Sequence, residues 1–406
     1  MADRDWFDMH RVCGVGTTGF GGRRALPATV AWTFGLGFAA LIASSFEAAA
    51  LPPWGQAKTS PPASTSDTLV SKIAVFGEDN RKRIPKRLDA LRGSIGVIYN
   101  ERSRTVCSAF CVADDVIATA SHCVFRTKGE TPPPPEKFFF ARPGTASGSV
   151  RFAGTASRTA AQHIVAGMVG INTKPPIDAS RDWALVKLQS PACRGKNLPV
   201  VPMTPDDIET EANAGRLFQA AFHRDFGRWA MAYSQPCFGG RRGEANVAGP
   251  VVNDRDFNDP LNLVLHSCDT GGASSGSPLL IESAEGPKVV AINVGTFVQS
   301  RVMIEEGGVV KRAPPSPVAN TAVSTIAFAG RIDALRSATV LTTATDIRAL
   351  QQLLISARLL DGPPTGRFES ETRSAIEQFE VGEGLTVLGV PTRALLEHLT
   401  RNGTTR

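Results

Sequence analysis

The chain has 406 residues, with 44 Lys and Arg against 38 Asp and Glu, and a formal net charge of +6 at pH 7. This length predicts two or three domains, each able to bury a core. The densest basic patch, at residues 81–87, lacks the interleaved aromatic side chains of a nucleic-acid site, so we expect no nucleic-acid partner. Abundant Gly and Pro favour short strands and loops over long helices.

The N-terminal region has the features of an export signal. Residues 1–24 are polar and end in two arginines, residues 25–43 are nearly all apolar, and residues 48–50 fit a small-x-small cleavage site. This pattern predicts that residues 1–50 direct export, which gives a secreted or periplasmic protein. Because the apolar stretch is long enough to span a bilayer, an uncleaved membrane anchor facing the periplasm is the alternative. A glycine-rich match to a dinucleotide fingerprint at residues 14–19 follows no strand, and we expect no cofactor.

The region after the signal divides into a linker and a β-rich domain. Residues 51–72 are rich in Pro, Ser and Thr and are typical of an extended linker. Residues 73–335 contain short apolar runs separated by turn residues, a pattern that indicates an all-β barrel or sandwich. The strands expected from these runs are Ser94–Tyr99, Ser108–Val112, Val116–Thr119, Lys137–Phe140, Val150–Ala153, Trp183–Leu188, Phe218–Phe222, Leu261–Leu265, Val289–Val294 and Ile326–Ala329.

The C-terminal part, residues 342–402, has helical periodicity instead. Between residues 346 and 360 the apolar positions recur at helical spacing, Ser370 can cap a second helix, and Pro391 can start a third. We therefore expect a small three-helix module after the β domain.

The stretch Asp269–Pro278 (Asp-Thr-Gly-Gly-Ala-Ser-Ser-Gly-Ser-Pro) surrounds a serine with small residues between two apolar runs. A tight turn of small residues exposes a hydroxyl and lets backbone N–H groups converge on one point. Acyl transfer needs this arrangement, because negative charge grows on a carbonyl oxygen as the serine attacks. A flexible linker is the alternative, but linkers rarely lie between two strand-like runs.

A base and an orienting acid for this serine can also be recognised. His122 ends an apolar run and is followed by Cys123, while Cys107 lies on the preceding run, so a hairpin would bring the two sulfurs together. Asp182 opens another apolar run and is our candidate to orient His122; Asp178, in a turn-like stretch, is its competitor. None of the seven cysteines has CxxC spacing with matching histidines, so we expect no metal site.

With these residues in place, the chain resembles the chymotrypsin-like serine proteases of the bacterial glutamyl-endopeptidase-like branch. The resemblance rests on Cys107 to Cys123, Asp182–Val186, Asp269–Pro278 and Val290–Gly295, with Val75–Arg81 similar to the leader before the first strand. It implies two six-stranded antiparallel barrels with a triad of His122, Asp182 and Ser275 between them. The further implications are an oxyanion hole formed by the N–H groups of Ala273 and Ser275, selection of Ser275 over Ser274 and Ser277, and a Cys237–Cys268 disulfide. Cys111 and Cys193 either pair or are buried thiols.

Three positions depart from the family pattern. Ala273 replaces a usual glycine, and its Cβ could turn the peptide so that the oxyanion hole is not formed at rest. Ser274 replaces the aspartate that pairs with a new N-terminal amine in trypsin-like enzymes, so that route of activation is not expected. Asn293, in the block that includes Gly295, replaces the pocket histidine of glutamate-specific members, whereas Asp269 at the pocket base would select Arg or Lys. The sequence leaves the cleavage specificity open.

Residues 342–402 resemble the peptidoglycan-binding domain, type 1. The matching residues are Ile347–Leu354, Gly366–Phe368, Thr372–Phe379, Gly384–Leu385 and Gly389, whereas Glu380, Thr365 and Leu388 depart from the pattern. We therefore predict a secreted serine endopeptidase that acts on proteins or peptides, with a module that targets peptidoglycan. The alternatives are a helical module that no longer grips the wall, a catalytically impaired wall-binding protein, and a peptidoglycan-associated hydrolase.

Overall fold

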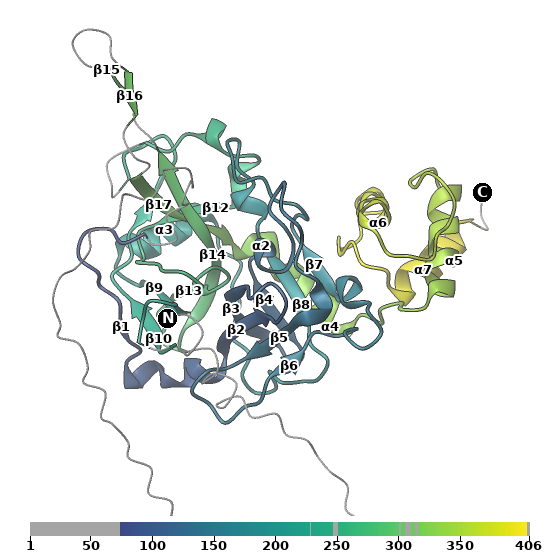
Figure 1. Ribbon diagram of the computed structural model, residues 1–406, viewed down its shortest axis with the longest axis horizontal. Coiled ribbons are helices and arrows are strands. Elements are labelled where there is room, and N and C mark those ends of the chain that lie inside the picture. The colour runs from purple at the N-terminus through teal and green to yellow at the C-terminus, as the bar shows by residue number, and fades with distance from the viewer. Residues whose placement is uncertain are drawn as a thin grey trace, which may run out of the picture. The chain divides into compact units, whose positions relative to one another are not determined.

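The computed structural model describes residues 74–227, 229–246, 251–299, 302–304, 310–312 and 316–403. The predicted export signal at residues 1–50 and the predicted linker at residues 51–72 lie outside these residues. Figure 1 shows two β-sheets followed by a group of C-terminal helices. Within the described ranges, no helix is both long and apolar enough to cross a membrane.

The first sheet contains seven antiparallel strands and delivers His122 at the end of one of them. Strands β2 and β3 are buried at every position, because their two faces pack on the barrel interior and on neighbouring elements. Large apolar side chains such as Phe110, Phe138 and Ile117 are fully buried there. In spatial order the strands are β6 (Val150–Arg151), β5 (Phe138–Ala141), β2 (Ile95–Asn100), β3 (Val106–Ala113), β4 (Val116–Thr119), β8 (Ala184–Lys187) and β7 (Ile164–Ala166).

The second sheet contains eight antiparallel strands, and the serine turn lies between two of them, β12 and β13. Apart from the two-residue strands β6, β1 and β11, each sheet has six strands, as the family resemblance implied. The spatial order is β1 (Lys82–Arg83), β10 (Met231–Ser234), β9 (Leu217–Phe222), β13 (Pro278–Ile281), β14 (Lys288–Gln299), β17 (Ser316–Ser324), β12 (Leu263–His266) and β11 (Gly239–Gly240); β15 (Val302–Ile304) and β16 (Val310–Arg312) pair separately.

One expected strand is absent. Ile326 and Ala327 end one short 3-10 helix, and Ala329 begins a second after Phe328, so the strand prediction there was wrong. The Oγ of Ser324 accepts a hydrogen bond from the N–H of Ile326 and caps the first of these turns, and the run lacks the alternation of a half-buried strand. The helices of the peptidase region are α2 (Ser121–Val124), α3 (Pro205–Asn213) and α4 (Ile332–Ser337), with 3-10 turns η1 (Lys86–Gly93), η2 (Pro135–Lys137), η3 (Ala160–His163), η4 (Ala179–Arg181), η5 (Asp254–Asp256), η6 (Pro260–Asn262), η7 (Thr325–Ala327) and η8 (Ala329–Arg331).

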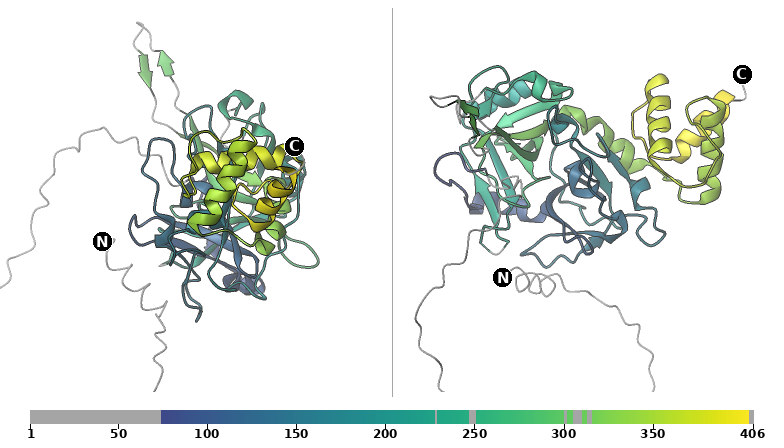
Figure 2. Two further views of the ribbon diagram at one scale, coloured as in Figure 1. Left: turned by 90° about the vertical axis from the view of Figure 1, so that its right-hand side faces the viewer. Right: turned by 45° about the horizontal axis from the view of Figure 1, so that its top comes forward.

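The C-terminal module has the three expected helices, α5 (Ala344–Ser356), α6 (Ser370–Gly382) and α7 (Arg393–Gly403) (Figure 2). Thr343 begins α5, because its Oγ1 accepts a hydrogen bond from the N–H of Asp346. Ser370 is the first helical residue of α6 rather than its cap, which is Glu369. The apolar faces of the helices meet in a separate core that includes Ile347, Leu350, Leu354, Ala375, Ile376, Phe379, Leu395 and Leu399.

Two buried side chains hold the loops of this module in the same way. Gln351 of α5 accepts a hydrogen bond from the N–H of Gly366 (2.8 Å). Glu380 of α6 accepts two, from the N–H groups of Leu388 and Gly389 (both 2.8 Å). Glu380 is 4% exposed, and burial raises the pKa of its carboxyl to about 7. The carboxyl group of Glu380 thus holds the loop at residues 388–389 through contacts that a neutral amide side chain could also make.

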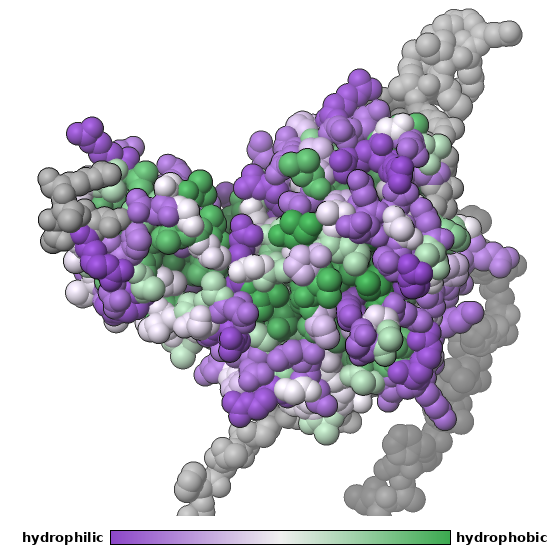
Figure 3. All heavy atoms as spheres, turned by 180° about the vertical axis from the view of Figure 1, so that it is seen from behind, coloured by the Kyte–Doolittle hydropathy of each residue, from purple (hydrophilic) through white to green (hydrophobic). Residues whose placement is uncertain are grey.

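Arg373 of α6 joins the module to the first barrel. Its guanidinium donates to the carbonyls of Ile164 (3.0 Å) and Ala161 (2.9 Å) and lies over the rings of Phe125 and Phe368. Phe125 follows the short helix α2 that carries His122, so the module touches the peptidase domain close to that histidine. Figure 3 shows apolar residues exposed on the face opposite to that of Figure 1, among polar ones.

Candidate active site

His122 and Asp182 form a close pair in the first barrel. Strand β4 ends at Thr119, and the single turn α2 turns His122 toward Asp182, which lies two residues before the start of β8. The Nδ1 of His122 lies 2.6 Å from Oδ2 of Asp182, and the N–H of His122 donates to Oδ1 at 2.9 Å. Because Asp182 is 5% exposed and accepts both bonds, it fixes the imidazole ring and the tautomer with the proton on Nδ1. With the proton on Nδ1, the lone pair of the neutral ring is on the other nitrogen, Nε2.

The competing carboxylate, Asp178, has a different role. Its Oδ2 accepts from the N–H of Asn172 (2.8 Å) and its Oδ1 from the side-chain amide of Asn258 (2.9 Å). Asp178 is buried and ties together two loops, so the structure pairs His122 with Asp182 rather than with Asp178.

Ser275 lies in the turn between β12 and β13, where a glycine allows the two barrels to approach closely. Its Oγ is half-buried and donates to the carbonyl of Val294 at 3.5 Å, and its carbonyl accepts from the N–H of Ser108 at 2.8 Å. Gly276 follows with φ +82°, and a Cβ there would lie 2.2 Å from Oγ1 of Thr119. Only glycine therefore lets the serine turn contact the strand that leads to His122.

A disulfide supports both sides of this contact. Cys107 and Cys123 are bonded, and Sγ of Cys123 lies 3.6 Å from Nε2 of His122 and 3.9 Å from the carbonyl oxygen of Ser275. Among the described residues, Cys107, His122 and Cys123 are the one cluster with the spacing of metal ligands, but both sulfurs are used in the disulfide and offer no thiolate. Two further disulfides are Cys111–Cys193 and Cys237–Cys268.

Ala273 has a left-handed backbone, and its N–H points away from the loop that contains Arg224. Its φ is +79°, a conformation that costs a non-glycine residue about 1–2 kcal/mol. The carbonyl of Gly272 accepts from the N–H of Arg224 at 2.8 Å, so the N–H of Ala273, on the opposite side of the same planar peptide, points the other way. Across the described part of the chain, neither this N–H nor that of Ser275 donates to another group of the protein. Backbone N–H groups that are not used within the protein can donate to a developing oxyanion.

Asp269 and Asn293, two of the residues that we considered for specificity, have buried side chains that are hydrogen-bonded within the protein. Asp269 is 1% exposed, and its carboxylate accepts from the N–H groups of Phe76 (2.9 Å) and Asn80 (2.8 Å). Asn293 is also 1% exposed; its Oδ1 accepts from Nε2 of His266 and its amide donates to the carbonyl of Ser274. Both side chains thus connect the serine turn to neighbouring segments of the chain.

Gly295, the third candidate, remains half-buried on β14, and a Cβ there would meet only Oγ1 of Thr321, at 3.7 Å. Next to it lies a polar group that the sequence analysis missed. Oδ1 of Asn320 accepts from Oγ1 of Thr296 (2.7 Å) and of Thr270 (3.3 Å). Asn320 lies on β17, which no apolar run had indicated, and no local signal connects it to the other two.

Two family models match this chain. Residues 107–292 match the family model described as "Trypsin-like peptidase domain". The chain contains a trypsin-like peptidase domain. Residues 343–399 of the same chain match the model described as "Putative peptidoglycan binding domain", so the peptidase domain is followed by a domain of that family.

Two solved structures are similar to this chain at low sequence identity. A Glu endopeptidase solved in complex with MPD is 16% identical, with a TM-score of 0.40, and the match covers 65% of this chain and 100% of that one. A thermostable serine protease, AL20, from an extremophilic microorganism is also 16% identical, with a TM-score of 0.36 and coverage of 58% and 93%. No curated protein matches the chain.

Proposed function

We propose that the chain is an exported serine endopeptidase, in which Ser275 attacks the peptide carbonyl. His122 takes the serine proton through Nε2 and returns it to the leaving amine, and Asp182 holds the imidazole and stabilises its charged form. The N–H groups of Ala273 and Ser275 receive the oxyanion. The observation that carries this proposal is the His122–Asp182 pair at 2.6 Å beside a serine turn with two unused N–H groups.

Ser275 is a better nucleophile than its two neighbours. Oγ of Ser274 is buried and donates to the carbonyl of Gly271 at 2.8 Å, and Oγ of Ser277 is buried and accepts from the side-chain amide of Gln219 at 2.9 Å. Ser275 alone of the three is half-exposed, which an attacking group needs.

Export and wall targeting complete the proposal. Three disulfides fit an oxidising compartment outside the cytoplasm, and the predicted signal at residues 1–50 would deliver the chain there. The family match of residues 343–399 supports binding to peptidoglycan, which would bring the peptidase to protein substrates at the cell wall.

A fluorophosphonate probe tests the catalytic part. We expect the purified protein to be labelled on a peptide that contains Ser275, and we expect Ser275→Ala to abolish labelling. The exposed Ser337, on α4 far along the chain, provides the control, and Ser337→Ala should label like the parent. Labelling that persists in Ser275→Ala would refute the assignment, and a wholly unreactive parent would favour an impaired wall-binding protein.

The wall-binding part is tested with the full-length Ser275→Ala protein and purified sacculi. We expect it to sediment with sacculi after washing in salt and to remain in the supernatant with cellulose. A protein that stays in solution in both cases would show that the helical module no longer binds the wall. Release of muropeptides by the parent protein would favour a peptidoglycan hydrolase instead.

A further inference from the structure

Ser274 replaces the aspartate that pairs with a new N-terminal amine in activated trypsin-like enzymes, so the serine turn of this chain is held by other contacts. Such contacts come from the loop between β9 and β10. His223, at the end of β9, is 1% exposed, and its Nδ1 accepts a hydrogen bond from the N–H of Gly271 at 2.9 Å. The next residue, Arg224, donates its N–H to the carbonyl of Gly272. Two consecutive residues of this loop thus hold two consecutive residues of the turn.

The two bonds constrain the peptide that matters for the oxyanion. With the N–H of Gly271 and the carbonyl of Gly272 both directed at the β9–β10 loop, the 272–273 peptide cannot rotate without breaking a bond. Its own N–H, that of Ala273, therefore stays on the active-site side. If the peptide rotated, the carbonyl of Gly272 would point into the oxyanion hole and one of the two donors would be lost.

His223 accepts this bond only while it is neutral. Burial, and after it the charge of Arg81, lowers the pKa of His223 to about 4, although Asp225 and Asp79 act in the opposite direction. Because Nδ1 accepts from Gly271, the ring proton is on Nε2.

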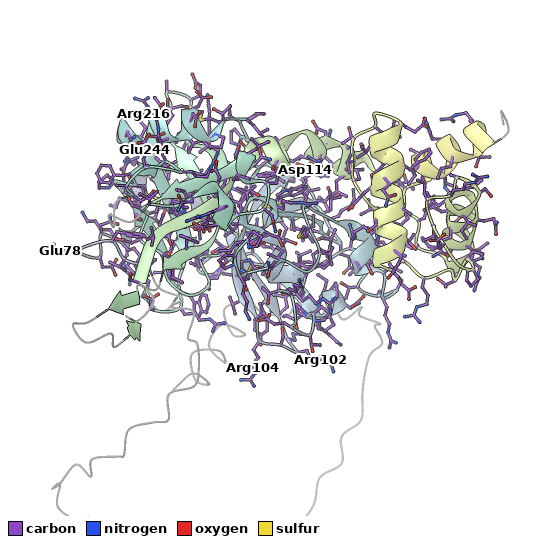
Figure 4. The ribbon with its side chains drawn as sticks, turned by 90° about the horizontal axis from the view of Figure 1, so that it is seen from above. Glu78, Arg102, Arg104, Asp114, Arg216 and Glu244 are labelled. Atoms are coloured by element: carbon purple, nitrogen blue, oxygen red, sulfur yellow. A yellow bond between two sulfur atoms is a disulfide. The ribbon has the colours of Figure 1, made fainter. Side chains whose placement is uncertain are left out.

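The ion pair between Arg81 and Asp225 packs against the other side of the serine turn. Arg81 donates to both carboxylate oxygens of Asp225, at 3.1 and 2.7 Å, and its side chain is only 4% exposed. A Cβ on Gly271 would lie 2.3 Å from Oδ1 of Asp225 and 2.6 Å from Nη1 of Arg81, so the pair packs directly on the turn. The same segment carries Phe76 and Asn80, which bind Asp269; Figure 4 labels Glu78 of this segment at the periphery of the peptidase domain.

We propose that His223 is a positioning residue which, with the Arg81–Asp225 pair, locks the Gly271–Ala273 backbone in the form that presents the Ala273 N–H to the substrate. This inference rests on the proposed serine peptidase function. It assigns to a neutral histidine and an ion pair the support that an N-terminal amine and an aspartate give elsewhere, so the turn needs no newly cut N-terminus to be ordered.

The test compares His223→Leu, which removes the acceptor, with His223→Asn, whose Oδ1 can replace Nδ1. With p-nitrophenyl acetate as a substrate that needs no specificity pocket, we expect His223→Leu to lower kcat about 10- to 100-fold with little change in KM, because one oxyanion donor is misplaced. His223→Asn should restore kcat to within about three-fold of the parent. Gly271→Ala, which collides with the ion pair, should resemble His223→Leu, whereas Gly330→Ala, where a Cβ meets nothing within 4 Å, is the matched control.

A second readout does not depend on catalysis. Hydrogen exchange of the segment 269–277, measured by mass spectrometry in the Ser275→Ala background, should become at least about ten-fold faster in His223→Leu and stay slow in His223→Asn. Unchanged exchange in His223→Leu would overturn the inference, whatever happens to kcat. If exchange behaves as expected but the parent neither reacts with fluorophosphonate nor hydrolyses the ester, the positioning stands and the serine peptidase proposal fails.

Discussion

Replacing Glu380 by glutamine should remove a pH-dependent cost from the stability of the helical module. The carboxyl has an ordinary pKa of 4.5 when exposed and a pKa of about 7 when buried in the folded module. Between these values the folded module keeps its proton while the unfolded chain releases it, so rising pH favours the unfolded chain. The free energy of unfolding should fall by about 1.4 kcal/mol per pH unit in this window, to a total loss of about 3 kcal/mol by pH 8.

Glutamine keeps a carbonyl oxygen to accept from Leu388 and Gly389 but cannot ionise. The difference in unfolding free energy between Glu380→Gln and the parent should therefore grow by about 2 to 3 kcal/mol from pH 5 to pH 8 and level off above that. Taking the difference at each pH cancels titrations that both proteins share.

Urea unfolding followed by circular dichroism at 222 nm measures this difference, because the signal is dominated by helices. The control is Glu371→Gln, the same substitution at an exposed position of the same helix α6. If the Glu380→Gln difference is as flat as that of the control, the reasoning from burial is refuted.

Two further predictions concern long-range contacts. Asp269→Ala should lower the free energy of unfolding by about 2 kcal/mol or more, because the N–H groups of Phe76 and Asn80 lose their acceptor. The preferred residue in a peptide-library cleavage profile should stay unchanged. Loss of a preference for Arg or Lys would instead show that the carboxylate faces the substrate. Arg373→Met should make the connection at residues 338–343 more sensitive to added thermolysin, because the bonds to Ile164 and Ala161 are lost. Arg367→Met, at an exposed arginine of the same module, should be cut at the parental rate, and equal rates in both variants would contradict a role for Arg373 in docking.

The parts of the structure that follow local rules could be predicted from the sequence. Strand β4 has the predicted bounds, and the three C-terminal helices follow from apolar spacing. The pairing of Asp182 with His122 followed from its place at the mouth of an apolar strand. Helix α3 was missed although its signals were present: Thr204 as a cap, Pro205 in the first turn, and Ile208 and Ala212 four positions apart.

The remaining features depend on contacts between residues far apart in the chain. Asp269 was a candidate for the base of a specificity pocket, and nothing near it in sequence indicated that its partners are Phe76 and Asn80, 193 and 189 positions away. The orientation of the Ala273 peptide likewise depends on Arg224, and a local rule on Cβ volume could only raise the question. Such positions are fixed by tertiary hydrogen bonds, which override local preference.

The disulfide between Cys107 and Cys123 lies where the proposed base and the proposed nucleophile come together. Sγ of Cys123 lies 3.6 Å from Nε2 of His122 and 3.9 Å from the carbonyl oxygen of Ser275, so the cross-link restrains the segment on which the two residues meet. Before this bond forms, His122 and Ser275 lack the covalent cross-link that lies beside them. In the exported protein that we propose, this cross-link forms outside the cytoplasm, where the cell keeps thiols oxidised.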